Sequence, residues 1–437
     1  MEFLGISSVA GVLVAIAACF LSVEKCFLLL VVTAPLTTVA VLNISDSSIC
    51  IYHLVWLVLS VRMILLYAKK QVPITMIFGP FLLFCLASTF LAFFNGDVVV
   101  KGVDGGFASV QPSFQQYTQW GYLFIAVSTA WYAMYMTRLG LVSVKSFVIA
   151  LNAGLVLVLL GALFQLLLPV DMVSELYRNH VHTMYTFNKS RISSTFLEPS
   201  MLSLYLVPMM GIHLFKLLSR PNWRSGILLL ASLAVCLQNN SSSAFLGLGV
   251  LAAFFVSLCL FSPRSVKIPH MGLVVSTVVF VLLLVVGVSG MFDSSIATLL
   301  TKLNIGSSAS SVSISGMERS ESMSLMAQVF AEHPLVGVGW GTARGYDLLT
   351  TWAAEIGLVG LLLFFVPLIG SIVGLLRSAR KDDGGFFGGG SCDVAFAAYL
   401  ICATAILLVS VPEPYYLSFW LVVGVSAGAS RLGEDKR

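Results

Sequence analysis

Long apolar runs separated by short polar turns recur along the whole chain. Most runs are close to the roughly 20 residues that a helix needs to cross a membrane core, and segments such as 151–170 and 271–290 contain no charged residue. The alternation expected of barrel strands is missing, so only a helix can satisfy the backbone there. The pattern predicts an all-α polytopic bundle of about 13 transmembrane helices, with a range of about 12 to 14. The predicted spans are 5–23, 26–43, 50–67, 73–94, 118–137, 146–169, 198–216, 224–238, 242–261, 271–289, 349–376, 393–411 and 416–430.

The composition excludes an ordinary soluble domain. Hydrophobic residues make up 58% of the chain and charged residues only 10%, with a mean hydropathy of +0.97, whereas soluble domains carry roughly 25% charged residues. We therefore expect residues 1–437 to form a single integral membrane domain. Residues 5–23 are predicted to be a retained span, because no basic residue precedes them as it would in a signal peptide.

The basic residues cluster in alternate connections between the predicted spans. The clusters are Lys69 and Lys70; Arg138 and Lys145; Lys216, Arg220 and Arg224; Arg264 and Lys267; Arg377, Arg380 and Lys381; and Arg431, Lys436 and Arg437. Because basic loops remain on the cytoplasmic side, these connections and the C-terminus are predicted to be cytoplasmic. Three long loops then lie on the opposite side: 95–117, 171–197 and about 290–348.

The loop 171–197 is the most basic of these outer segments. It contains Arg178, Lys189 and Arg191, with His180 and His182 between them, on the side where basic residues are disfavoured. An anionic ligand would offset this charge, and phosphate or pyrophosphate suits guanidinium groups, which bind such oxygens in pairs. The alternative is a solvated loop whose cations contact lipid headgroups.

Glu198 stands at the start of the next predicted span. Its spacing from Thr195 is that of a capping box, and Pro199 follows in the first helical turn. A carboxylate at the rim of the hydrocarbon core is costly, so a catalytic or ligand-binding role is the competing interpretation. The polar residues 239–243 are interpreted as a hairpin turn between two spans.

The loop 290–348 is too long for a simple connection. Residues 317–334 carry an apolar stripe at helical spacing and predict an amphipathic helix on the membrane surface or over the mouth of the bundle. The stripe consists of Met317, Leu325, Met326, Val329 and Phe330. After His333, the glycines Gly337 and Gly339 allow close approach of the backbone to a neighbour. Arg344 favours an anionic ligand there, while a plain glycine-rich connector is the alternative.

Five segments, taken in order, resemble the O-antigen polymerase and ligase superfamily, the Wzy and WaaL proteins. The segments are RISSTFLEPSMLSLYL (191–206), LQNNSSSAFLGLGV (237–250), SGMERSESM (315–323), HPLVGVGWG (333–341) and AAEIGLVGLLLFF (353–365). The resemblance implies a multi-pass protein of the bacterial inner membrane. It also implies a glycosyltransferase that needs neither metal nor cofactor and acts at the periplasmic face.

The same resemblance implies the binding partners. Donor and acceptor would both be undecaprenyl-diphosphate-linked oligosaccharides, in contact with membrane lipid and without nucleic acid, and a chain-length regulator protein is left open as a further partner. Arg191 and Arg319 match the family's outer arginines, which implies that they hold the donor diphosphate. Glu198 is the first candidate for the general base and His333 the second.

One departure from the family pattern bears on the type of enzyme. Ligases carry a His–Asn pair where this chain has Tyr346 and Asp347, which favours a polymerase over a ligase. The competing hypotheses are an O-antigen ligase, a lipid-linked oligosaccharide transporter or flippase, and a noncatalytic assembly partner. A transporter would concentrate polar groups on broken helices near the middle of the membrane.

Overall fold

The computed structural model describes most of the chain. The described residues are 2–3, 5–44, 47–70, 76–95, 98–101, 107–110, 115–183, 191–239, 241–261, 314–343, 345–381 and 391–432. The predicted span 271–289 and the first part of the loop 290–348 lie outside them, as do Lys189 and Arg344.

Helices dominate the described part of the chain, which confirms the prediction of an all-α fold. They are α1 (Gly5–Phe20), α2 (Val23–Thr33), α3 (Ile51–Lys70), α4 (Gly79–Asn95), α5 (Gln115–Arg138), α6 (Val144–Leu167), α7 (Val170–Leu176), α8 (Pro199–Ser219), α9 (Trp223–Asn239), α10 (Ser242–Phe261), α13 (Ile314–Glu332), α14 (Leu348–Lys381), α15 (Ser391–Ser410) and α16 (Leu417–Leu432).

Among the described residues, five helices are long and apolar enough to cross a membrane. They are Val144–Leu167, Pro199–Ser219, Ser242–Cys259, Leu348–Lys381 and Cys392–Ser410. Shorter apolar helices accompany them, at Ile6–Phe20, Ile51–Leu66, Gly79–Phe90 and Leu417–Ala429. The chain is therefore a membrane-embedded helical protein, and the count of about 13 spans stays a prediction.

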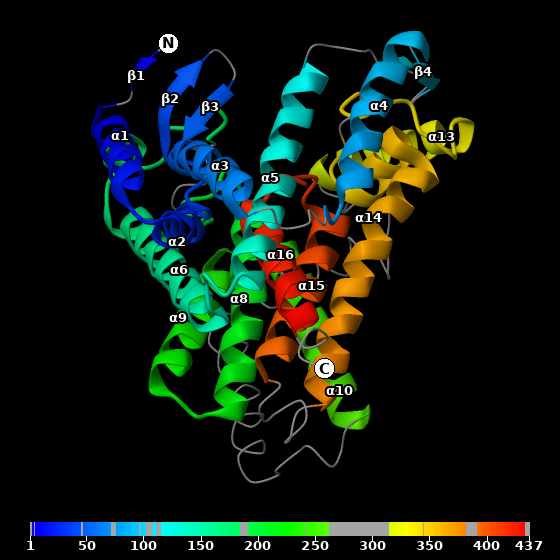
Figure 1. The fold of residues 1–437 in the computed structure, drawn as a ribbon. Coiled ribbons are helices and arrows are strands. Elements are labelled where there is room, and N and C mark those ends of the chain that lie inside the picture. The colour runs from blue at the N-terminus through cyan, green and yellow to red at the C-terminus, as the bar shows by residue number, and fades with distance from the viewer. Residues whose placement is uncertain are drawn as a thin grey trace.

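Two small antiparallel sheets accompany the helices. Strands β1 (Glu2–Phe3), β2 (Ala40–Ile44) and β3 (Ser47–Cys50) form one sheet, and β4 (Val98–Lys101) pairs with β5 (Phe107–Val110) in the other. The pairing registers join Phe3 to Leu42, Asn43 to Ser48, and Val99 to Ser109. Both sheets lie at the end of the bundle that also carries α13 (Figure 1).

The first sheet replaces part of an expected span. The sequence pattern predicted one helix over 26–43, but α2 ends at Thr33 and the chain enters β2 seven residues later. Pro35 follows the end of α2 and has no amide to continue a helix. With 11 residues, at about 1.5 Å per residue, α2 is much shorter than a membrane core of roughly 30 Å.

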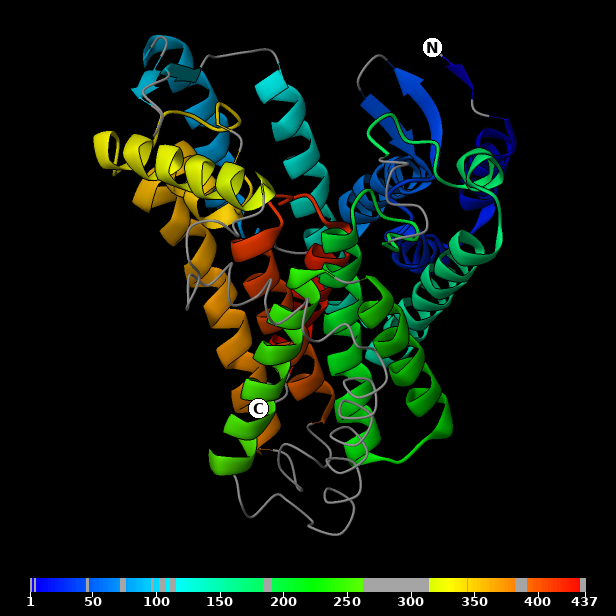
Figure 2. The ribbon, with the colours of Figure 1, turned by 180° about the vertical axis from the view of Figure 1, so that it is seen from behind.

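The two ends of the bundle differ in charge. Lys216 lies in the last turn of α8, Arg220 follows that helix and Arg224 lies in the first turn of α9, while α14 ends at Arg380 and Lys381. Figures 1 and 2 show these helix ends together at one end of the molecule, opposite α13 and the two sheets. We call them the basic end and the loop end. The charge asymmetry of the sequence thus corresponds to opposite ends of the folded bundle.

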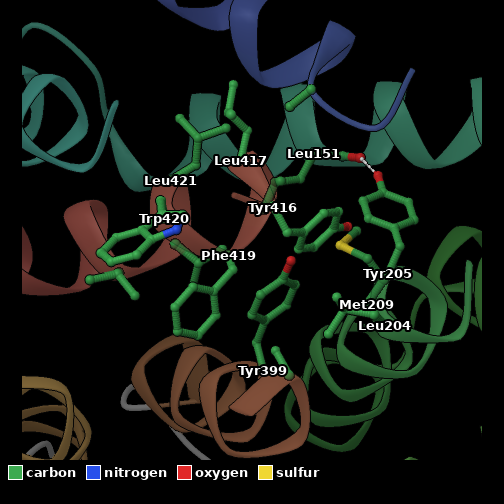
Figure 3. Close-up of a cluster of buried hydrophobic side chains, with 14 of the residues drawn as sticks. Leu151, Leu204, Tyr205, Met209, Tyr399, Tyr416, Leu417, Phe419, Trp420 and Leu421 are labelled. Carbon is green, nitrogen blue, oxygen red and sulfur yellow. Dashed lines mark hydrogen bonds between the residues drawn. The ribbon is translucent and has the colours of Figure 1, made fainter. Parts of the chain in front are cut away.

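Helix α15 occupies the centre of the bundle and packs against α8, α10, α14 and α16. Figure 3 shows Tyr399 from α15 pointing toward the ring of Tyr416, with the ring of Tyr205 from α8 beside it. The Tyr205 hydroxyl donates to the carbonyl of Leu151 on α6 at 3.3 Å. Helix α16 lies so close to α5 that a Cβ on Gly424 would overlap a carbonyl oxygen of α5. This tight core fixes the positions of the loops at the loop end.

Candidate functional site

Residues 191–198, which we call the serine segment, are held against the N-terminal third of the chain. The Thr195 carbonyl accepts hydrogen bonds from the Thr38 amide and the Thr37 hydroxyl, both at 3.0 Å. The Thr195 hydroxyl donates to the Pro35 carbonyl at 2.8 Å. The chain that turns away from α2 therefore forms one wall for the serine segment.

The opposite wall is helix α6. The side-chain oxygen of Gln165 accepts hydrogen bonds from the amides of Ser193 and Ser194, at 3.1 and 2.7 Å. Ser194 has a φ of +51°, a left-handed conformation that costs a non-glycine residue free energy. Its hydroxyl donates to the Val158 carbonyl at 2.6 Å. A Cβ on Gly161 would lie 2.7 Å from that hydroxyl, so α6 offers the segment a close, side-chain-free surface.

The predicted phosphate-binding residues Arg178 and Arg191 are brought to this same segment. Arg178 is buried and donates to the Ser193 hydroxyl, while Arg191 is half-buried at the start of the segment. The neighbouring Tyr177 hydroxyl donates to the Gly161 carbonyl at 2.6 Å. Burial raises the pKa of Tyr177 to about 12, and the positive charge of Arg178 opposes that rise. Arg178 thus contacts the segment that Arg191 begins.

Glu198 does not form the capping box that its spacing suggested. Helix α8 begins at Pro199, so Glu198 occupies the N-cap position itself, and its side chain makes no capping hydrogen bond. Thr195 cannot act as the cap because its hydroxyl is directed to Pro35. The half-buried carboxylate of Glu198 instead accepts the Ser200 hydroxyl at 3.1 Å. The capping-box interpretation is therefore wrong, and the Glu198 carboxylate does not cap α8.

The polar hairpin between α9 and α10 adjoins the start of α8. The Asn239 amide group donates to the Pro199 carbonyl at 2.7 Å and to the Ser203 hydroxyl at 2.9 Å. The sequence pattern predicted only a turn here. A buried Asn that satisfies the first turn of a neighbouring helix joins segments 191–206 and 237–250 into one unit.

A second unit forms around residues 333–341, which we call the glycine loop. Gly337 and Gly339 have φ values of +69° and +124°. A Cβ on Gly337 would overlap the backbone of Glu355, and one on Gly339 would overlap Ala92 on α4. The glycines thus permit the close backbone approach that their spacing suggested, and the neighbours are helices of the same chain.

The backbone amides of the glycine loop already donate hydrogen bonds to acceptors within the protein. The Gly337 amide donates to the His333 carbonyl at 3.1 Å, and the Val338 amide donates to the Ala354 carbonyl at 2.9 Å. The Gly339 amide donates to the Glu355 carbonyl at 2.9 Å, and the Trp340 amide donates to the Ser88 hydroxyl at 3.1 Å. Helix α14 is interrupted at Gly357, whose φ is +57°, and this interruption exposes the carbonyls that accept two of those bonds. The role predicted for Gly337 and Gly339 in substrate binding stays a prediction, and it cannot use these amides.

Glu355 is a buried carboxylate next to the glycine loop that the sequence analysis did not consider. Its side chain is 3% exposed, and it accepts the Ala343 amide at 3.3 Å. Its backbone carbonyl also holds the glycine loop. An acidic residue inside the apolar run AAEIGLVG is the signal that could have identified it, because such a residue in a span is retained only when it has partners.

Helix α13 covers the glycine loop. Met326 and Val329 are buried, and they pack against Val338 and Ala354, as one face of an amphipathic helix would. Figure 2 shows α13 lying across the start of α14. Arg319 belongs to α13, although its side chain lies outside the described residues.

The remaining predicted site residues flank the glycine loop. His333 is half-buried, directly after α13, and its carbonyl accepts the Gly337 amide. Tyr346 is 45% exposed. Its neighbour Asp347 accepts the Thr350 amide at 2.8 Å and so supports the first turn of α14. The two positions that would carry the ligase pair therefore hold one exposed ring and one helix-capping carboxylate.

The two units meet at the turn between α15 and α16. The ring of Phe196, in the serine segment, lies 6.2 Å from Tyr416, and the ring of Trp340, in the glycine loop, lies 6.4 Å from Tyr415. Adjacent residues of one turn thus contact both predicted site regions. Sequence reasoning missed this turn, although VPEPYY places a carboxylate and two tyrosines at the end of a span.

No family model matches the sequence, and a search of the curated proteins finds no match. In the described part of the chain, no group of three or more His, Cys, Asp or Glu side chains is arranged to hold a metal ion.

Proposed function

We propose that the protein is a multi-pass glycosyltransferase of the bacterial inner membrane that polymerises undecaprenyl-diphosphate-linked repeat units at the periplasmic face. About 13 spans, a cytoplasmic C-terminus and a periplasmic loop end complete this proposal. The observation that carries it is spatial. Segments 191–206 and 237–250 form one unit, segments 315–323, 333–341 and 353–365 belong to a second, and both units contact the turn 411–416.

The proposed reaction transfers the growing glycan from its lipid diphosphate to the incoming unit. A hydroxyl oxygen of the acceptor forms a bond to the anomeric carbon of the donor, the bond from that carbon to the diphosphate oxygen breaks, and undecaprenyl diphosphate leaves. Arg191 and Arg319 would stabilise the charge that develops on the leaving diphosphate. Arg178, Lys189 and Arg344 would add positive charge around it.

The proton of the acceptor hydroxyl needs a base. Glu198 is the first candidate, because its half-buried carboxylate begins α8 without a capping bond. His333 is the second candidate, and exposed Tyr346, which follows the glycine loop, would contact the glycan. A chain-length regulator protein would be a further partner, and membrane lipid surrounds the spans.

A transporter is the second candidate function, favoured by the interruption of α14 at Gly357 next to buried Glu355. However, Glu355 lies near the start of α14, which begins at Leu348. Its carboxylate already accepts a hydrogen bond from the Ala343 amide, and its carbonyl accepts one from the Gly339 amide. A substrate site of a transporter would instead lie near the middle of the helix. The polymerase proposal therefore has the stronger support, with an O-antigen ligase as the nearest alternative.

Elongation by the purified protein tests the proposal. In detergent, with its cognate lipid-linked repeat units and without metal or nucleotide sugar, the protein should produce a ladder of longer glycans. Arg191→Ala should lower the rate by at least about 100-fold, as loss of a charge-stabilising donor does. Arg191→Lys should recover only part of it, since ammonium cannot bind two oxygens in parallel. Exposed Arg220, at the basic end, provides the matched control: Arg220→Ala should keep the full rate.

Three results would overturn the proposal or change its type. Absence of any ladder with the cognate substrate would reject a polymerase. Equal rates for Arg191→Ala and Arg220→Ala would reject the diphosphate role. Deletion of the gene should leave a single repeat unit on the lipopolysaccharide core, whereas a core without any unit would identify a ligase.

A further inference from the structure

Asn179 joins the basic loop (171–197) to the chain around strand β2. The Asn179 amide donates to the Thr38 carbonyl at 3.2 Å, and the Asn179 carbonyl accepts a hydrogen bond from the side chain of Asn43 at 3.1 Å. The side-chain oxygen of Asn179 accepts a hydrogen bond from the Ala40 amide at 2.8 Å. Figures 1 and 2 show the chain that follows α7 beside β2 and β3. The loop is therefore fixed to the first sheet.

Further hydrogen bonds complete this attachment. The side-chain nitrogen of Asn179 donates to the Ser7 hydroxyl on α1. Two residues later, the Val181 amide donates to the Ser48 hydroxyl at 3.1 Å, and that hydroxyl donates to the side-chain oxygen of Asn43 at 2.6 Å. The two main-chain and two side-chain polar groups of Asn179 thus all bind residues that are distant in sequence. A rigid scaffold that holds a loop in this way is typical of loops that carry binding residues.

The residue directly before this anchor is Arg178. Its side chain is 1% exposed and donates to the Ser193 hydroxyl of the serine segment. Its amide donates to the Val173 carbonyl at 3.1 Å, and the preceding Tyr177 donates from its hydroxyl to the Gly161 carbonyl at 2.6 Å. The position of the guanidinium is therefore defined from several sides. Because the group is buried, its positive charge is screened much less by salt than an exposed charge would be.

Thr38 connects Asn179 with the serine segment. The Thr38 amide donates to the Thr195 carbonyl at 3.0 Å, while the Thr38 carbonyl accepts the hydrogen bond from the Asn179 amide. One residue thus contacts the basic loop on one side and the serine segment on the other. A displacement of Asn179 would therefore move Arg178 relative to Ser193.

We propose that Asn179 is a positioning residue that holds the Arg178 guanidinium against the serine segment, so that its charge acts on a bound diphosphate. Binding of a charged group depends steeply on placement, since an error of about 1 Å can cost about 100-fold in rate. Asn179 itself does not contact the substrate, because its polar groups are bound within the protein. The identity of the ligand as a lipid diphosphate rests on the proposed function, whereas the positioning of Arg178 for a diphosphate does not.

Binding of inorganic pyrophosphate to the full-length protein in detergent, measured by titration calorimetry, tests this role. Asn179→Ala removes the two side-chain hydrogen bonds and keeps the two main-chain ones. It should weaken pyrophosphate binding by about tenfold, which corresponds to roughly 1.4 kcal/mol. Arg178→Gln removes the charge but keeps a donor for Ser193, and it should weaken binding at least as much. The unfolding temperature and the elution volume check that each variant is folded.

The double variant separates positioning from a purely structural role. If Asn179 acts through Arg178, Asn179→Ala should weaken binding no further once Arg178→Gln is present. The kcat/KM of elongation should follow the same pattern. Two effects that multiply in the double variant would mean that Asn179 acts independently of Arg178, and this result would overturn the proposal.

Asn222 provides the matched control. Its side-chain oxygen also accepts a hydrogen bond from a main-chain amide, that of Arg224 at 3.0 Å, but in the turn at the basic end. Asn222→Ala should bind pyrophosphate and elongate glycans like the wild type. Equal affinities of Asn179→Ala and Asn222→Ala for pyrophosphate would overturn the positioning role, as would the absence of pyrophosphate binding by the wild type.

The outcomes also separate this proposal from the polymerase. Pyrophosphate binding that depends on Asn179 only while Arg178 is present, without any elongation of lipid-linked units, keeps the positioning role and rejects the polymerase. Elongation in which the effects of Asn179→Ala and Arg178→Gln multiply keeps the polymerase and rejects the positioning role.

Discussion

The serine segment and the glycine loop are both short stretches of irregular backbone at the loop end, yet they are held in different ways. In the serine segment, side chains from distant parts of the chain satisfy the backbone: Gln165 accepts two amides, and Thr37 donates to a carbonyl. In the glycine loop, most hydrogen bonds join backbone to backbone, and the absence of a Cβ at Gly337 and Gly339 allows the close approach.

This difference separates two kinds of sensitivity to substitution. A segment held by side-chain acceptors loses stability when one acceptor is removed, because buried amides are left unsatisfied. A loop held by contact between backbones has few side chains to lose, but it cannot accommodate an added Cβ. The two segments would therefore make different contacts with the substrate. The serine segment can provide cationic side chains, whereas the glycine loop defines the shape of the backbone around the site.

The largest effect is expected from Gly337→Ala. The new Cβ would overlap the backbone of Glu355 at a φ of +69°. Left-handed strain and overpacking together should destabilise the protein by about 3 kcal/mol. Thermal unfolding in detergent, followed by loss of the monodisperse elution peak, measures this change.

Gly226→Ala is the matched control for that substitution. Gly226 lies in α9 with nothing within 4 Å of a new Cβ, so alanine should leave the unfolding temperature equal or slightly higher. If Gly337→Ala were as stable as Gly226→Ala, the glycine loop would not be held by backbone contact.

Much of the fold could be predicted because its helices are long and apolar. The helix α6 (Val144–Leu167) agrees within two residues with the predicted span 146–169. The end of α2 could not be predicted from apolar content, since the apolar run continues past Thr33 to Leu42. Hydrogen bonds from Thr37 and Thr38 to Thr195, a residue distant in sequence, hold the turn that leads from α2 to β2.

The candidate site likewise has one part that could be predicted from the sequence and another that could not. Arg178 and Arg191 could be placed in the same region because they share one basic loop, and the structure joins Arg178 to Ser193, two residues after Arg191. Their joint role in binding phosphate stays a prediction. The contact of Asn239 with α8 depends on tertiary packing between segments far apart in sequence. No local pattern contains that information.

An intermediate effect is expected from Gln165→Leu. Loss of the side-chain oxygen leaves the buried amides of Ser193 and Ser194 without their acceptor, which should cost about 2 kcal/mol. Hydrogen–deuterium exchange should rise in a peptide that covers the serine segment and stay constant in one that covers the glycine loop.

The control for this variant is Gln238→Leu, at an exposed position of α9. It should leave exchange unchanged in both peptides. A rise in both peptides for Gln165→Leu would contradict independent anchoring of the two units and would mean that the turn 411–416 transmits the disturbance between them.

The smallest effect concerns acid and the basic loop. Burial, with a contribution from His182, lowers the pKa of His180 from 6.5 to about 4. The unfolded chain therefore binds a proton below pH 6.5 that the folded chain refuses until about pH 4, so stability falls as the pH decreases through this window. Near pH 6 the loss should be on the order of 1 kcal/mol. The measurement is the unfolding temperature of wild type and His180→Gln across that range. The variant should have the flatter profile, and parallel profiles would exclude His180 as the source of the acid sensitivity.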